Sequence, residues 1–145
     1  MDKTDRRILE LLQKQARMSY RELGEQVHLS ANTVAERVRR LVDSGVITGF
    51  HAQLDTAALG LGVQALVEVK LNPETTAAFF EAALQDISGV VEAVLVTGGH
   101  DYQLRVVCRD QADLVRIVEA LRTQAGVGNT HSSLVLRHMV FRMPV

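Results

Sequence analysis

Residues 19–41 read SYRELGEQVHLSANTVAERVRRL, and this stretch decides how the first third of the chain folds. Ser19 and Glu22 match the S-x-x-E capping box that begins a helix, and apolar positions at helical spacing follow. Ser30 is a second N-cap residue a few positions later, and Gly45 ends the helix that Ser30 begins. The stretch therefore predicts a short helix, a tight turn and a longer helix.

An earlier helix is predicted from Ile8, Leu11 and Leu12, which follow helical spacing. Either Asp2 or Thr4 can cap it. Three helices with a tight turn between the last two form a helix-turn-helix, whose last helix enters the major groove of double-stranded DNA. The first third of the chain is therefore predicted to bind DNA.

The last helix of this unit carries polar side chains suited to DNA. Asparagine can form paired hydrogen bonds with adenine, arginine can do so with guanine, and hydroxyl groups can reach phosphates. The simpler interpretation is a solvated helix face on which Glu36 and Arg40 pair. The position of this helix, after a capped short helix and a turn, favours DNA binding. The expected DNA-contacting residues are Ser30, Asn32, Thr33, Glu36, Arg37, Arg39 and Arg40.

The rest of the chain predicts a β-α-β-β-α-β order. Before it, residues 50–54 alternate apolar and polar side chains, which predicts a connecting strand, and residues 57–62 predict a hinge. The order is that of a ferredoxin-like domain, in which two helices cover one face of an antiparallel sheet. The fold class is therefore α+β. The predicted strands are residues 63–71, 90–97, 101–108 and 127 to about 140, and the predicted helices are residues 74–87 and 112–124.

The uncovered face of this sheet is expected to show apolar residues such as Leu66, Val94, Leu104 or Leu134, or their alternates. A small domain does not usually leave an apolar sheet face in water. Pairing of two sheets in a homodimer is therefore expected. Together these elements predict three segments: a DNA-binding domain at residues 1–48, a connecting strand and hinge at 49–61, and a second domain at 62–145.

Charge and composition agree with an intracellular DNA-binding protein. Residues 1–48 carry nine Lys and Arg against seven Asp and Glu, whereas the rest carries seven against ten. The single cysteine, Cys108, excludes an internal disulfide and multi-cysteine metal sites, and a buried thiol is expected. No signal peptide or membrane span is evident. We expect a cytoplasmic protein with no membrane association, no metal and no cofactor.

The loop between the two middle strands is the candidate ligand site. Gly98 and Gly99 expose backbone amides that suit a carboxylate, and Asp101 suits an ammonium group. An amino acid carries both groups. The alternative is a structural hairpin turn that Asp101 caps.

In order and spacing, these segments resemble the leucine-responsive regulatory protein/AsnC family of transcription regulators. The resemblance covers essentially the whole chain. It rests on residues 5–9, 17–23, 29–30, 33–34, 36–41, 45–47, 97–102 and 126–127, with Thr130 and Ser132.

The resemblance implies a winged-type helix-turn-helix domain joined to an effector-binding domain, in dimers that commonly assemble into octamers or larger rings of dimers. It also implies an amino acid or a similar small molecule as effector, bound near the connection between the second and third strands. The residues that it assigns to this site are Thr97, Gly98, Gly99, His100, Asp101, Tyr102, Thr130 and Ser132.

Two alternatives stay open beside an amino-acid-responsive regulator. One is a regulator or DNA-architectural protein without a small-molecule effector. The other is an enzyme similar to the sirohaem decarboxylases, which resemble this family in both domains. The five histidines show no metal-ligand or acid–base spacing, and the helix with the arginines has no use in such an enzyme. We therefore expect a protein that is not an enzyme.

Overall fold

A computed structural model describes residues 1–145, which form two compact units. The first unit comprises Met1–Gln53 with Met139–Val145, and the second comprises Leu54–His138. The expected division into residues 1–48, 49–61 and 62–145 stays a prediction. No helix is both long enough and apolar enough to cross a membrane.

The first unit is built from three helices, α1 (Lys3–Lys14), α2 (Tyr20–Val27) and α3 (Ala31–Asp43). Asp2, Ser19 and Ser30 cap them, and the first two do so as full capping boxes. Apolar residues that recur at helical spacing meet in one core. The core consists of Ile8, Leu11, Leu12, Leu23, Val34 and Val38. The predicted helix-turn-helix is thereby confirmed.

The turn between α2 and α3 depends on two backbone positions. His28 ends α2 in the left-handed conformation, at φ 56° and ψ 44°. The amide of Leu29 then donates to the carbonyl oxygen of Gly24 at 3.0 Å. A Cβ atom on Gly24 would collide with the Leu29 carbonyl oxygen. The turn therefore requires a residue without a side chain at position 24.

Replacing His28 with glycine is expected to stabilise the first unit by about 1 kcal/mol, because glycine adopts positive φ without steric strain. Thermal unfolding followed by circular dichroism should show a midpoint raised by about 4 °C. Glycine at Gln26, two positions earlier in an ordinary helical turn, should instead lower stability by about 1 kcal/mol. Equal shifts for both variants would contradict this explanation of the turn.

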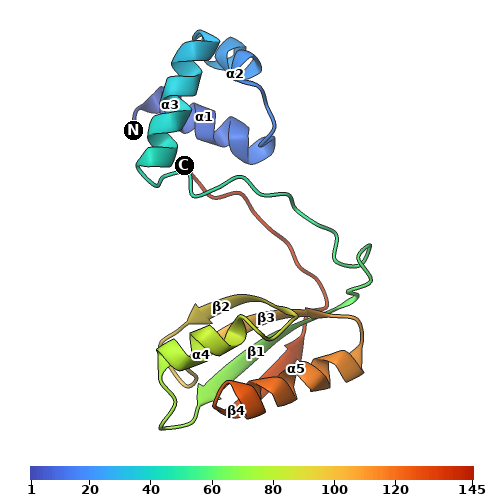
Figure 1. Ribbon diagram of the computed structural model, residues 1–145. Coiled ribbons are helices and arrows are strands. Elements are labelled where there is room, and N and C mark those ends of the chain that lie inside the picture. Colours follow the sequence, from blue (N-terminus) through green and yellow to red (C-terminus); the bar gives the residue numbers. More distant parts are fainter. The chain divides into compact units, whose positions relative to one another are not determined.

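The second unit is an antiparallel sheet covered by two helices on one face (Figure 1). The strand order is β2-β3-β1-β4, so the two central strands are β3 and β1. The predicted β-α-β-β-α-β order is confirmed. Its elements are β1 (Val63–Leu71), α4 (Ala77–Leu84), β2 (Val90–Leu95), β3 (Tyr102–Cys108), α5 (Gln111–Gln124) and β4 (Val127–Leu134).

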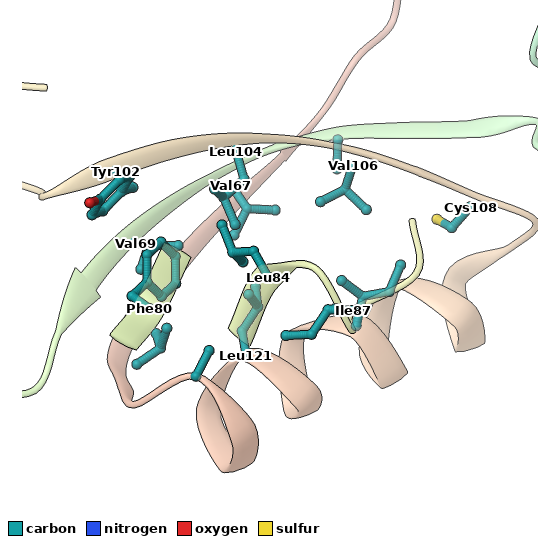
Figure 2. Close-up of a cluster of buried hydrophobic side chains, with 14 residues drawn as sticks. Val67, Val69, Phe80, Leu84, Ile87, Tyr102, Leu104, Val106, Cys108 and Leu121 are labelled. Atoms are coloured by element: carbon teal, nitrogen blue, oxygen red, sulfur yellow. The ribbon is translucent and has the colours of Figure 1, made fainter. Parts of the chain in front are cut away.

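The core of the second unit lies between the sheet and the helices. Figure 2 shows Val67 and Leu104 on the central strands above Leu84 and Leu121 of the helices. The rings of Phe80 and Tyr102 lie 4.6 Å apart at a tilt of 48°. Cys108 is buried, as expected, and burial raises the pKa of its thiol.

The uncovered face of the sheet is more polar than expected. Leu104 pairs with Val67 and Leu134 pairs with Ala65, so both leucines lie on the helix-covered side. Leu66 and Val94 do lie on the uncovered face, because they pair with Arg105 and Gln103. Glu92 on β2 accepts from the Arg105 guanidinium at 3.0 Å on the same face. The sequence left open which of these residues or their alternates occupy this face, and the pairing places Leu66 and Val94 there and Leu104 and Leu134 on the other face.

Two predicted strand segments do not form. Residues 50–54 form no strand, because their backbone makes no hydrogen bond with another segment of the chain. The last strand ends at Leu134 rather than near residue 140. The reason is that β1 begins at Val63 and offers no partner backbone beyond that point.

Asp113 near the start of α5 makes the second unit sensitive to acid. Its buried carboxylate accepts from the Arg109 amide at 3.2 Å and from Arg116 Nε at 2.8 Å. The Arg109 amide first, and then Arg116, hold the pKa of this carboxyl below its usual value near 3.8. Its stabilising contribution is therefore complete above about pH 5 and is lost as the pH falls through the lowered pKa.

Asp113→Asn should therefore reduce the loss of stability between pH 6 and pH 3. Urea unfolding at several pH values measures this, with Asp86→Asn, an exposed carboxyl without a hydrogen-bond partner, as the control. An unchanged pH dependence in Asp113→Asn would contradict this role.

Candidate functional site

The exposed side of α3 carries most of the residues predicted to contact DNA. Asn32, Thr33, Glu36, Arg39 and Arg40 are all exposed. Asn32 has no hydrogen-bond partner within the chain, so both its amide oxygen and its amide nitrogen are free to bind another molecule. Ser30 is occupied as the cap of α3, where its hydroxyl accepts from the Thr33 amide at 3.2 Å.

The arginines of α3 differ in how free they are. Arg39 donates to Glu36 Oε1 at 2.8 Å, and both side chains are about two-thirds exposed. Arg40 is exposed and makes no ion pair or side-chain hydrogen bond. Arg40 is therefore the arginine on this face whose charge is fully available to a phosphate or a base.

Arg37 lies apart from this surface, although the sequence grouped it with the DNA-contacting residues. Its Nη1 atom donates to Asp2 Oδ2 and to Asp5 Oδ1, both at 2.7 Å. Only 21% of its side chain is exposed. Because its guanidinium is bound to α1, Arg37 is not part of the surface that we propose to contact DNA.

The loop between β2 and β3 places its residues differently from the sequence prediction. Thr97, Gly98 and Gly99 are exposed, and Gly98 has a φ of 118°, as a tight turn requires. Asp101 Oδ2 accepts from the Leu71 amide at 2.8 Å, and Lys70 Nζ lies 3.8 Å from Oδ1. Asp101 thus links the loop to the end of β1 and does not cap the hairpin turn itself.

Beside this loop the second unit has an open hollow of about 440 Å³. Gly99, His100 and Thr130, three of the eight residues expected at the effector site, line it. His100 Nδ1 lies 3.7 Å from Glu68 Oε2. The other lining residues are Glu68, Lys70, Asn129 and His131.

The sequence prediction missed these four lining residues. Glu68 and Lys70 alternate with the buried Val67 and Val69 along β1, so they face away from the helices. Glu68 pairs with His131, and Lys70 pairs with Asn129. The available signal was a pair of charged residues at alternate positions of a strand. The hollow thus brings a carboxylate, an ammonium group and two imidazoles together.

Three predicted effector residues, Tyr102, Ser132 and Thr130, have side chains on the other side of the sheet. Tyr102 is buried in the core, where its hydroxyl donates to Glu81 Oε1 at 2.6 Å. Burial and the Glu81 carboxylate raise the pKa of Tyr102 to about 12. Ser132 pairs with Val67, and its side chain therefore points toward the helix-covered side.

Thr130 borders the hollow, but it pairs with the buried Val69, so its side chain points toward the helix-covered side. There its hydroxyl accepts from Arg122 Nη2 on α5 at 3.3 Å. No three His, Cys, Asp or Glu side chains gather closely enough to hold a metal ion.

Comparisons with known proteins cover both units. Residues 1–42 match the AsnC-type helix-turn-helix domain, and residues 64–145 match the Lrp/AsnC ligand binding domain. The HTH-type transcriptional regulator Rv2324 of Mycobacterium tuberculosis is 38% identical over 144 residues, which are 99% of this chain and 97% of that protein.

Two further comparisons come from other bacteria. The leucine-responsive regulatory protein of Salmonella typhimurium is 35% identical over 142 residues, covering 96% of this chain and 87% of that protein. The transcriptional regulator NMB0573 of Neisseria meningitidis was solved as a complex with L-Met. It superposes with a TM-score of 0.91 at 30% identity, covering 100% of this chain and 96% of that one.

Proposed function

Because the chain belongs to the Lrp/AsnC family of DNA-binding transcriptional regulators, which are not enzymes, we propose that α3 reads a specific DNA sequence and that an amino acid controls this binding. The observation that supports DNA reading is that Asn32 and Arg40 are both exposed on α3, and that neither side chain makes a hydrogen bond within the chain. An asparagine with both amide atoms free can bond adenine in the major groove. Arg40 supplies a phosphate contact or a second base contact.

The effector site that we propose is the hollow beside Gly99. Lys70 binds the carboxylate of a free amino acid there, and Glu68 binds its ammonium group. The backbone around Gly99 is open to a ligand because no side chain covers it. The solved complex of NMB0573 with L-Met supports an amino acid as the ligand class.

Assembly of at least a homodimer completes the proposal. Leu66 and Val94 give the uncovered sheet face an apolar area that a second copy can cover. Two copies of α3 then enter successive major grooves, about 34 Å apart, and the operator is a pseudo-palindrome. Several such dimers assemble into a larger ring. The protein acts in the cytoplasm, where the DNA is.

An amino acid in this hollow changes DNA binding only if it binds one assembly state better than another. The hollow lies on the same sheet face as the proposed dimer contact, since Glu68 and Leu66 alternate with buried residues along β1. Effector binding and assembly are therefore linked at one surface.

A thermal-shift screen of the amino acids tests the effector site. A ligand at about one hundred times its Kd stabilises the folded state by about 2.7 kcal/mol, which raises the midpoint by about 10 °C. Glu68→Gln and Lys70→Met should each remove most of this shift, because each removes one charge that pairs with the ligand. Glu74→Gln, an exposed change outside the hollow, should keep it.

A full shift in both Glu68→Gln and Lys70→Met would contradict the proposed site. No shift with any amino acid would favour the alternative of a regulator without an effector.

A further inference from the structure

The side chain of Arg37 makes the only side-chain polar connection between helices in the first unit. Every other side-chain hydrogen bond or ion pair within residues 1–53 joins residues at most four positions apart. Arg37 instead bridges 35 positions to Asp2 and 32 positions to Asp5. It therefore connects α3, the helix that carries the DNA-reading surface, to the start of α1.

Each of the two aspartates uses one carboxylate oxygen to cap α1 and the other to bind Arg37. Asp2 Oδ1 accepts from the Asp5 amide at 2.8 Å, and Asp5 Oδ2 accepts from the Asp2 amide at 3.0 Å. These bonds form the capping box of α1. The remaining oxygens, Asp2 Oδ2 and Asp5 Oδ1, both accept from Arg37 Nη1 at 2.7 Å. One arginine nitrogen thus holds both members of the cap.

The position of Arg37 is not that of a solvated surface arginine. The side chain of Asp5 is 13% exposed and that of Arg37 is 21% exposed. Arg37 Nε is buried without a hydrogen-bond partner, and it is the only buried side-chain nitrogen or oxygen of the chain in that state. Such a loss of hydration is tolerated only where the rest of the group is well bound. The guanidinium is therefore largely withdrawn from solvent on its Nε side.

We infer that Arg37 is a positioning residue that sets the orientation of α3 against α1, and that it does not contact DNA. The apolar contacts of Val34 and Val38 hold α3 on the core, but hydrophobic contacts have little directional preference. Two short, charge-assisted hydrogen bonds fix a direction. This inference rests on the proposed reading of DNA by α3.

The bond between Asp5 and Arg37 predicts that removing the Asp5 carboxylate weakens DNA binding, which is the opposite of what its charge alone predicts. An acidic residue in a DNA-binding unit repels phosphates, so its removal ordinarily strengthens DNA binding. If Asp5 holds α3 through Arg37, its removal weakens binding instead, because a smaller fraction of molecules presents α3 in the competent orientation.

The test uses the full chain and a labelled duplex that the wild-type chain selects from a random-sequence pool, called the selected duplex below. Binding is measured by fluorescence anisotropy at several salt concentrations, at a temperature where circular dichroism shows each variant folded. Arg37→Gln and Asp5→Asn should each weaken binding about ten-fold with the salt slope unchanged. Arg37→Gln already removes the bonds to both aspartates, so the double variant should bind within about two-fold of Arg37→Gln alone.

Arg40→Gln is the matched control, and it should lower the salt slope by about 0.9. If the wild-type chain selects no duplex, the proposed function is wrong. That outcome is distinct from a failure of the positioning role of Arg37, which is measured on variants after a duplex has been selected. The positioning role is wrong if Asp5→Asn binds more tightly, or if Arg37→Gln lowers the slope as Arg40→Gln does. Should Asp5→Asn unfold, Asp2→Asn, which keeps the Arg37–Asp5 bond, must still weaken binding for the inference to stand.

Discussion

Gly24→Val is expected to remove a large part of the stability of the first unit and to weaken DNA binding. The added side chain would press on the backbone carbonyl of Leu29, which cannot move aside because the Leu29 amide is bonded to Gly24 itself. Forcing such atoms into a packed site costs about 3 kcal/mol. A unit of this size has a total stability of only about 3 to 8 kcal/mol.

Far-UV circular dichroism measures this loss as a lower melting midpoint of the first unit, while the second unit keeps its own core and a separate transition. Gly62→Val is the matched control, because a Cβ at Gly62 has no atom within 4 Å. The account of the turn is contradicted if Gly24→Val melts within about 2 °C of the wild-type chain.

Asn32→Ala is expected to remove most sequence preference while leaving non-specific DNA binding nearly unchanged. A paired hydrogen bond to a base contributes about 1 to 3 kcal/mol of discrimination, which is about 5- to 150-fold in affinity for the selected duplex. Arg40→Ala should behave differently if it neutralises a phosphate, since affinity then falls for all duplexes and the salt slope decreases by about 0.9.

Anisotropy titrations against the selected duplex and a scrambled duplex separate these two outcomes. Arg7→Ala is the control, because Arg7 is an exposed arginine on α1 that pairs with Glu10 at 2.7 Å. Equal losses on both duplexes for Asn32→Ala would show that this side chain does not read bases.

The local elements were predictable from the sequence because their signals are local. Ser19 and Glu22 form the capping box that their spacing indicated, and Ser30 caps α3. The alternation along residues 63–71 and the helical spacing of Ile117 and Leu121 likewise correspond to β1 and α5. In each case the residues that decide the structure are close together in the sequence.

Side-chain directions that depend on a distant partner were not predictable. Arg37 was grouped with Arg39 and Arg40 because the three are neighbours in sequence, yet its partners lie more than thirty positions away. Tyr102 follows the loop that carries Gly99, but the phase of β3 turns its ring into the core. A strand pattern gives the period of alternation, and only the pairing with neighbouring strands fixes which face is which.

Two functional features could have been found with signals already present in the sequence. Gly24 interrupts an amphipathic helix just before a turn, which indicates a close approach of backbone. Glu68 and Lys70 are charged residues two positions apart on a strand that is otherwise buried on one face. Their significance depends on His100 and His131, which the fold brings beside them.

Selection of duplexes from a random-sequence pool by the full wild-type chain tests the central claim most directly. The account predicts enrichment of a pseudo-palindromic sequence with half-site centres about one helical turn, or a multiple of it, apart. The Asn32→Ala chain, carried through the same selection, should lose the enrichment at the bases that this residue reads. If the wild-type chain enriches no sequence, or if Asn32→Ala enriches the same sequence equally well, α3 does not read DNA in the way proposed here.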